Sequence, residues 1–261
     1  MSKEWNAGIY HQVSAPQVSW GKKVLARIEL RGDETVLDAG CGTGRLTRDL
    51  LEALPRGRVV ALDVSQNMID AARAYLIPDF GDRVEFIACD VLHMPFNGQF
   101  DGIFSTASFH WVHDHEALFR ILHRALRPGG WLCAQCGGAG NLDRFFGRLH
   151  QLMAAPAYSP FFHDFASPWE FSDATTAAGR LKRAGFEAIE TNLEEAPTQF
   201  STPQEYQQFV GHIILHRHLQ RLPTAELRES FLGTVTSQAT EAAPPLLLDY
   251  VRLNLQARKA L

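Results

Sequence analysis

The stretch from Val36 to Gly44, which reads VLDAGCGTG, constrains the fold of this chain more than any other segment. Apolar residues and one aspartate end a predicted strand, and three glycines at alternate positions lead into a predicted helix over 44–54. Glycine adopts positive φ and lets a ligand approach the backbone without a Cβ in the way. The loop opens on a helix N-terminus, whose N–H groups favour a carboxylate or phosphate. Such a unit predicts a nucleotide-binding site in an open α/β sheet.

The glycine spacing separates this loop from two common phosphate-binding motifs. The dinucleotide fingerprint G-x-G-x-x-G would place its third glycine where the chain has Arg45, which disfavours an NAD-dependent oxidoreductase, and the sequence contains no G-x-x-x-x-G-K-[ST] motif. The nine residues instead resemble motif I of the class I S-adenosylmethionine-dependent methyltransferases, (V/I)LD-x-G-C-G-T-G. The resemblance implies S-adenosylmethionine as cofactor and a Rossmann-like, seven-stranded, mostly parallel sheet with helices on both faces.

Length and composition narrow the class further. With 261 residues, of which 46% are apolar, the chain suits one α/β domain with added segments, or at most two small domains. A net charge of −4 excludes the basic footprint of a nucleic-acid or anionic-membrane partner. The four cysteines are too few for a disulfide scaffold, and Cys133 and Cys136 lie in an apolar predicted strand, so we expect no metal. Without a membrane-length apolar run or a signal region, we expect a soluble, cytoplasmic protein.

Strands and helices alternate along the chain, which predicts a parallel sheet covered on both faces. Strands are predicted at 35–39, 58–63, 84–88, 100–105, 131–136 and 186–191. Helices are predicted within 1–30, at 44–54, after Ser65, at 114–126, 140–155 and 173–184, and as a pair within 203–243 that separates near Pro223. A loop is predicted over 156–170.

The last residues alternate between apolar and polar side chains. Val251, Leu253 and Leu255 alternate with Arg252 and Asn254, a period of two that favours a strand over the helix that can also be drawn here. With this strand, the cofactor-binding core comprises 31–137, 172–200 and 246–261. The segments 1–30, 138–171 and 201–245 would then form a helical lid over the carboxyl ends of the strands, where ligands bind in such sheets.

Each part of S-adenosylmethionine predicts a partner near the glycine loop. The backbone of Gly40 and Gly42 suits the amino acid end, and Asp38 can hold the ammonium group. Asp63 ends the second predicted strand, 19 residues beyond Gly44. A carboxylate there can accept two hydrogen bonds from the ribose diol.

The methyltransferase resemblance implies further cofactor contacts. It assigns the ribose to Asp63 and the adenine amino group to Asp90. It also implies that Val64 and Met68 pack on the adenine, that the Val91 N–H reaches a ring nitrogen, and that the main chain of Ser105 and Thr106 lines the methionine moiety. Tyr10 and Gln17 lie where N-terminal residues of the family close over the cofactor.

Residues after the fourth predicted strand face the methyl acceptor in this fold. Residues 105–118 resemble the trans-aconitate and malonyl-carrier-protein methyltransferases, which esterify carboxylates. In-line methyl transfer requires alignment and exclusion of water. A carboxylate acceptor needs no base, whereas a hydroxyl or amine does, so His110 is a candidate base or simply a packing residue. Candidate acceptor contacts are Trp111, Phe162, His163, His212 and His216; the last two have i, i+4 spacing, but no third zinc ligand is evident.

The sequence therefore predicts a methyltransferase that acts on a small molecule, with O-methylation of a carboxylate as the main hypothesis. The alternatives are methylation of a hydroxyl, amine or carbon of another metabolite, and a non-catalytic interaction module that binds S-adenosylmethionine. We expect a small-molecule acceptor, no nucleic-acid or membrane partner, and a monomer or homodimer.

Overall fold

The computed structural model describes residues 4–261 and divides them into two compact units. Unit 1 contains the described residues up to Ala139, together with Trp169–Glu194 and Arg252–Leu261. Unit 2 contains Gly140–Pro168 and Glu195–Val251. Each unit is therefore assembled from segments that lie far apart in the sequence.

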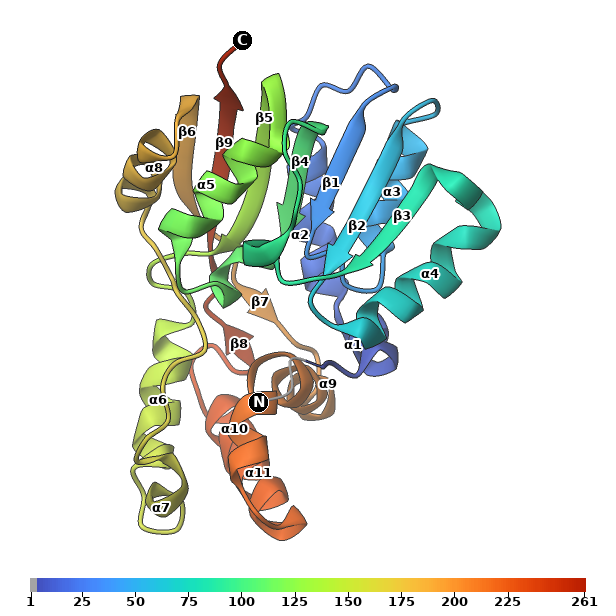
Figure 1. Cartoon of the computed structure of the whole chain (residues 1–261). Helices are drawn as coiled ribbons and strands as arrows, with labels where there is room; N and C mark the ends of the chain where they lie inside the picture. The colour runs from blue at the N-terminus through green and yellow to red at the C-terminus, as the bar shows by residue number, and fades with distance from the viewer. Residues whose placement is uncertain (1–3) are drawn as a thin grey trace. The chain divides into compact units, whose positions relative to one another are not determined.

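Unit 1 is built on a seven-stranded sheet in the order β3-β2-β1-β4-β5-β9-β6 (Figure 1). The strands are β1 (Thr35–Ala39), β2 (Arg58–Asp63), β3 (Val84–Ala88), β4 (Phe100–Thr106), β5 (Leu126–Gly137), β6 (Phe186–Glu195) and β9 (Val251–Lys259). Strands β1 to β5 pair in parallel, and β9 pairs antiparallel with β5. The seven-stranded, mostly parallel sheet and the strand at the end of the sequence are confirmed.

Helices cover both faces of this sheet. They are α1 (Ala7–Val13), α2 (Ala15–Leu25), α3 (Arg45–Ala53), α4 (Gln66–Phe80), α5 (His115–Ala125) and α8 (Ala174–Arg183), with short 3-10 turns η1 (Gly81–Arg83), η2 (Val91–His93) and η3 (Phe109–Trp111). Side chains of α2, α3 and α4 build the core on one face, and those of α5 and α8 build it on the other. No helix of residues 4–261 is long and apolar enough to cross a membrane.

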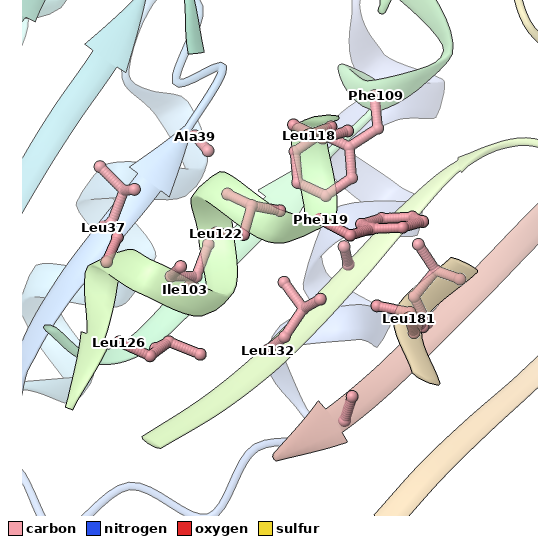
Figure 2. Close-up of a cluster of buried hydrophobic side chains, with 14 of the residues drawn as sticks. Leu37, Ala39, Ile103, Phe109, Leu118, Phe119, Leu122, Leu126, Leu132 and Leu181 are labelled. Atoms are coloured by element: carbon pink, nitrogen blue, oxygen red, sulfur yellow. The ribbon is translucent and has the colours of Figure 1, made fainter. Parts of the chain in front are cut away.

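The core beneath α5 shows why this helix forms where it does. Leu118 and Leu122, four residues apart on α5, belong to the same core cluster as Leu37, Ile103 and Leu132 of three neighbouring strands (Figure 2). All five side chains are fully buried. Truncating one such leucine to alanine costs about 2–5 kcal/mol of stability.

Side-chain caps set the helix starts. Ser65 Oγ accepts a hydrogen bond from Met68 N (3.3 Å) at the start of α4, and Asp114 Oδ1 accepts one from Ala117 N (2.8 Å) at α5. Each cap satisfies a backbone N–H that has no partner inside the helix. The helix that we predicted after Ser65 begins as expected.

A ladder of amide side chains crosses β5, β9 and β6. Gln135 Nε2 donates to Asn254 Oδ1 at 2.7 Å. The Asn254 Nδ2 group donates in turn to Asn192 Oδ1 (2.9 Å) and Glu194 Oε2 (3.1 Å). Because a slip of one residue would break every one of these bonds, the ladder fixes the register of β9 between its two neighbours.

Unit 2 is mainly helical. It contains α6 (Asp143–Met153), α7 (Ser159–Phe162), α9 (Pro203–Phe209), a π-helical turn η4 (Val210–Ile214), α10 (His216–Arg221), α11 (Ala225–Thr240) and two short paired strands, β7 (Thr198–Gln199) and β8 (Leu247–Leu248). Its core includes Tyr206, Phe209 and Phe231. The helices separate at Pro223 as predicted, because proline lacks the N–H that would continue α10.

Several boundaries differ from the sequence predictions. The first helices, placed with the lid segments, belong to unit 1, because Val24 of α2 is buried against the sheet; residues 1–3 of that segment lie outside the described residues. Strand β5 begins at Leu126 and β6 extends to Glu195, and the predicted loop over 156–170 contains α7. Arg252 and Asn254, two polar residues of the alternation in β9, are both buried, because a central strand has both faces covered.

Candidate functional site

The glycine loop between β1 and α3 has the geometry that its sequence predicts. Gly40, Gly42 and Gly44 have φ values of 88°, 54° and 83°. A Cβ on Gly40 would overlap with the side chain of Ser108, which follows β4. Gly40 N and Cys41 N both donate to a carbonyl at the end of β2, at 2.7 and 3.0 Å. Both the backbone conformation and the surrounding space therefore require glycine here.

Asp63, at the end of β2, ties the glycine loop to the sheet. Its Oδ2 accepts from Gly42 N (3.0 Å) and its Oδ1 from Ser65 N (2.9 Å). Loss of hydration raises the pKa of this carboxyl, and the backbone hydrogen bonds partly oppose that increase. Each oxygen has a second lone pair, so the carboxylate can still accept from two hydroxyl groups.

Asp38 is buried directly before the loop. Its Oδ2 accepts from Thr47 Oγ1 at 2.6 Å. Burial raises the pKa of Asp38 to about 7, the Thr47 hydrogen bond lowers it, and the negative charge of Asp63 raises it further. Two neighbouring carboxylates with raised pKa values form a site in which a cationic ligand would be favoured.

The residues that the sequence analysis predicts to contact the adenine follow β2 and β3 in the chain. Val64 is 38% exposed and Met68 is 3% exposed, so Val64 presents more surface to a ligand than Met68 does. Asp90 caps the η2 turn, which begins at Val91, through a hydrogen bond from Leu92 N (3.0 Å). The ends of β2 and β3 are joined here by a hydrogen bond from Cys89 N to the Asp63 carbonyl (2.9 Å). The structure therefore brings these segments together at one edge of the sheet.

Helix α1 lies against the glycine loop. A Cβ on Gly42 would lie 3.7 Å from Tyr10 Cε1, so the Tyr10 ring covers this glycine. His11 Nδ1 contacts Thr43 Oγ1 at 2.9 Å, and Arg45 donates to the His11 carbonyl at 3.1 Å. Loss of hydration raises the pKa of the Tyr10 phenol to about 12, and the charge of Asp63 adds to the increase.

Two buried polar atoms near the start of α2 lack hydrogen-bond partners. Gln17 Oε1 and Ser14 Oγ have no partner among residues 4–261. A buried acceptor without a partner costs about 1–3 kcal/mol, which is recovered if a ligand donates to it. An ammonium group could supply that donor, and the carboxylates of Asp38 and Asp63 suit a ligand with positive charge. This donor and acceptor set fits S-adenosylmethionine, which carries an ammonium and a sulfonium.

The end of β4 contains Ser105 and Thr106, whose main chain we predict to line the methionine moiety. Ser105 is buried, and its Oγ donates to the Ala39 carbonyl at 2.6 Å, which joins β4 to β1. The next residue is Thr106, and Ala107 then adopts a positive φ of 52°. The Ser105 hydroxyl is thus used within the sheet, and only its backbone is left to line a ligand.

His110 lies in the η3 turn. Gly137 N donates to its Nδ1 at 3.3 Å. A backbone N–H can only donate, so Nδ1 accepts and the ring proton is on Nε2. Loss of hydration lowers the pKa of His110 well below its ordinary value, and the positive charge of Arg252 lowers it further. His110 is therefore a neutral hydrogen-bond donor, and its lone pair is already in use.

Arg252 is a candidate site residue that the sequence analysis did not single out. It is 2% exposed, lies opposite Gly137 in the β5–β9 pairing, and its guanidinium carbon is 4.6 Å from the centre of the Trp20 ring. Its charge acts on both Tyr10 and His110. The period-two pattern indicated the face of the strand on which Arg252 lies, but not that the residue is buried. Charged residues are rarely fully buried unless they are paired.

The remaining predicted contacts lie in unit 2. Phe162 is buried against Phe231, and His163 is exposed with its Nδ1 3.1 Å from the Pro160 carbonyl. His212 and His216 line a pocket of about 560 Å³ together with Gln207, Leu219 and Arg228. Phe162 does not line this pocket. Among residues 4–261, no cluster of three or more His, Cys, Asp or Glu side chains could hold a metal ion.

A seven-stranded sheet with an antiparallel β9, and a glycine loop bound by an aspartate at the end of β2, are the features of the class I S-adenosylmethionine-dependent methyltransferases. A family profile described as a methyltransferase domain matches residues 36–130.

Curated relatives agree with this class. An uncharacterized methyltransferase of Schizosaccharomyces pombe is 31% identical over 191 residues, which cover 70% of each chain. A trans-aconitate 2-methyltransferase of Escherichia coli is 31% identical over 193 residues, 74% of this chain and 68% of that protein. The enzyme of the same name from Acidovorax ebreus is 32% identical, but the match spans only 58% of its length.

Solved structures share the fold. Phosphoethanolamine N-methyltransferase 2 of Haemonchus contortus, in complex with S-adenosyl-L-methionine, superposes with a TM-score of 0.64 at 17% identity, over 98% of this chain and 57% of that one. The [4+2]-cyclase SpnF superposes with a TM-score of 0.61 at 22% identity, over 93% and 81%. This chain belongs to the S-adenosylmethionine-dependent methyltransferase family, as predicted. It is a methyltransferase, and S-adenosylmethionine is its cofactor.

Proposed function

We propose that this enzyme transfers the methyl group of S-adenosylmethionine to a carboxylate oxygen of a small-molecule acceptor. A lone pair of the carboxylate forms the new O–CH3 bond, and the S–CH3 bonding pair stays on sulfur. The sulfonium becomes a neutral thioether, the product is a methyl ester, and no proton moves. The relatives named trans-aconitate 2-methyltransferase support this choice of acceptor. A net charge of −4 supports a small molecule over a nucleic acid.

The observation that carries the proposal is the buried Arg252 beside a neutral His110. A guanidinium binds a carboxylate through two parallel hydrogen bonds, which fixes the orientation of the oxygen that attacks. A hydroxyl or amine acceptor would need a base, and the Nδ1 lone pair of His110 accepts from Gly137. Its Nε2–H is a donor, which suits an anionic acceptor. The chemistry then depends on alignment and on exclusion of water.

On the cofactor side, we propose the roles that the family resemblance implies. Asp63 holds the ribose diol, and the backbone of Gly40 and Gly42 lies along the amino acid end. Asp38 and the Gln17 Oε1 acceptor receive the ammonium group. Val64, Met68, Asp90 and Val91 surround the adenine, and the main chain of Ser105 and Thr106 lines the methionine moiety.

The test uses methyl-labelled S-adenosylmethionine and a panel of carboxylic acids that includes trans-aconitate. Mild base is applied to the labelled product, because it hydrolyses a methyl ester and releases labelled, volatile methanol. We expect volatile label. Label that stays with the product after base would instead indicate methylation of oxygen in an ether, of nitrogen or of carbon, and would reject the carboxylate.

A further inference from the structure

Six aromatic side chains of unit 1 form a continuous surface beside the glycine loop. We call this surface the aromatic wall; its members are Trp5, Tyr10, His110, Trp111, Trp169 and Phe171. They come from three segments that are far apart in the sequence. All six are half-buried, whereas the core aromatic residues Phe104, Phe109 and Phe119 are at most 1% exposed. The wall is therefore a surface of the unit and not part of its core.

The rings of the wall contact one another in sequence. Trp5 meets Tyr10 and Trp111 edge to face, with centroid distances of 5.8 and 5.3 Å. Trp111 lies 5.5 Å from Trp169, which stacks on Phe171 at 6.1 Å with an angle of 9° between the planes. The Trp169 and Phe171 rings are nearly parallel, and aromatic rings favour stacking with planar groups.

The aromatic wall begins at the glycine loop, and two of its members interact with the charge of Arg252. Its Tyr10 end covers Gly42, and the charge of Asp63 acts on the same ring. The guanidinium of Arg252 acts on Tyr10 at one end and on His110 at the other. Arg252 lies opposite Gly137, whose N–H donates to His110, so an anion held by Arg252 would lie near the His110 part of the wall.

The middle of the wall is fixed by hydrogen bonds. In η3, Phe109 is buried in the core beside Leu118, which anchors the two wall residues that follow it (Figure 2). Arg180 donates to His115 Nδ1 (3.2 Å), so His115 Nε2 carries the hydrogen and donates to the Phe109 carbonyl (3.1 Å). The His110 carbonyl accepts a hydrogen bond from the backbone N–H of Glu170, and the Glu170 side chain accepts one from Arg180. A surface held in this way is organised before a ligand arrives.

We propose that the aromatic wall binds the carbon body of the methyl acceptor, and that this acceptor is a carboxylate attached to an aromatic ring. The proposal rests on the proposed function, because it takes the carboxylate and Arg252 from it. A flat π-system stacks on Trp169 and Phe171, whereas a saturated ring of equal size contacts them only through C–H groups. We expect a preference of about tenfold in kcat/KM for the planar member of such a pair.

The experiment compares benzoate with cyclohexanecarboxylate, which have the same number of heavy atoms and differ in planarity. The ratio of their kcat/KM values is measured by release of labelled methanol from the methyl ester. The variants are Trp169→Leu, which removes the stacking face, and Trp169→Phe, which keeps a smaller one. Trp131→Leu is the matched control: Trp131 is a half-buried tryptophan of the same unit that packs over Gly102 in the sheet. Thermal unfolding and S-adenosylhomocysteine affinity check that each variant is folded.

We expect the wild-type ratio to be about tenfold, to fall to near one in Trp169→Leu, and to persist in Trp169→Phe and in Trp131→Leu. Equal turnover of the two acids by the wild-type enzyme, or esters formed with trans-aconitate alone, would overturn the aromatic acceptor and leave carboxylate methylation standing. A complete absence of base-labile label with every acid would instead overturn the proposed function and the inference with it.

Discussion

The residues that we propose for the cofactor and those that we propose for the acceptor, both in unit 1, differ in charge and in chemistry. At the ends of β1 and β2 the chain presents the carboxyl groups of Asp38 and Asp63 beside the glycine loop, and Asp90 follows β3. After β4 and β5, and at the start of β9, it presents aromatic rings and the guanidinium of Arg252. We interpret this as a division of labour, in which a cationic donor and an anionic acceptor are each attracted to one side only. That division aligns the two reactants without a base.

The largest effect is expected for Asp63→Ala. The variant removes the acceptor for two ribose hydroxyls and frees Gly42 N, so the dissociation constant for S-adenosylhomocysteine should rise about 100-fold. Isothermal titration calorimetry measures this directly. The KM of the acceptor should stay within a factor of two or so, because Asp63 lies on the cofactor side. Unchanged binding would remove Asp63 from the site.

The next effect is that of Arg252→Met, which keeps most of the apolar stem and removes the charge. We expect kcat/KM for a carboxylate acceptor to fall about 30-fold or more, since one partner of a charge pair is lost. The affinity for S-adenosylhomocysteine should change little. If that affinity falls as much as kcat/KM, Arg252 binds the cofactor carboxylate and the two sides are not separated as we propose.

A smaller, pH-dependent effect is expected at Asp38. Its pKa of about 7 means that it is neutral below pH 7 and charged above it. If only the charged form holds the ammonium, affinity for S-adenosylhomocysteine should rise about eightfold from pH 6 to pH 7.5 and then level off. Asp38→Asn should bind more weakly and lose most of this dependence. An equal slope in the variant would show that another group titrates.

The smallest effect is expected for His110→Asn. A general base contributes about 100-fold or more, whereas a neutral donor at the edge of the site contributes only a few-fold. We therefore expect kcat for a carboxylate acceptor to fall about threefold, and the wild-type kcat to be insensitive to His110 protonation near neutral pH, because its pKa is well below its ordinary value. A loss of 100-fold in kcat would make His110 a base and reject this interpretation.

The same comparison explains what the sequence could reveal. Most of the proposed cofactor contacts lie between Asp38 and Val91, at or shortly after the ends of β1, β2 and β3. Strand ends and glycine spacing are local signals, so the ends of these strands and the glycine loop were predictable from the sequence. The confirmed strand β9 was also predictable, because a period of two is local.

The residues that we propose for the acceptor could not be predicted from local sequence signals. Trp5, Trp169 and Arg252 are 164 and 83 residues apart along the chain, and only the strand order β4-β5-β9 places the last of them beside Gly137. The alternation around Arg252 predicted a strand, but it says nothing about whether a layer of helices covers the face on which Arg252 lies. The grouping of α2 with the sheet was missed for the same reason, since Val24 shows its partners only after folding.

The place of β9 has a consequence for how the chain reaches its fold. It lies between β5 and β6 in the sheet but follows both in the sequence. Until it inserts, β5 and β6 each present an unpaired edge, and such edges recruit strands from other chains. The amide ladder through Asn254 gives the inserting strand one register in which its side-chain bonds are satisfied. Loss of β9 during synthesis or by proteolysis would therefore leave both β5 and β6 with an unpaired edge. Such a fragment should aggregate more readily than one that lacks β3, because β3 borders only β2.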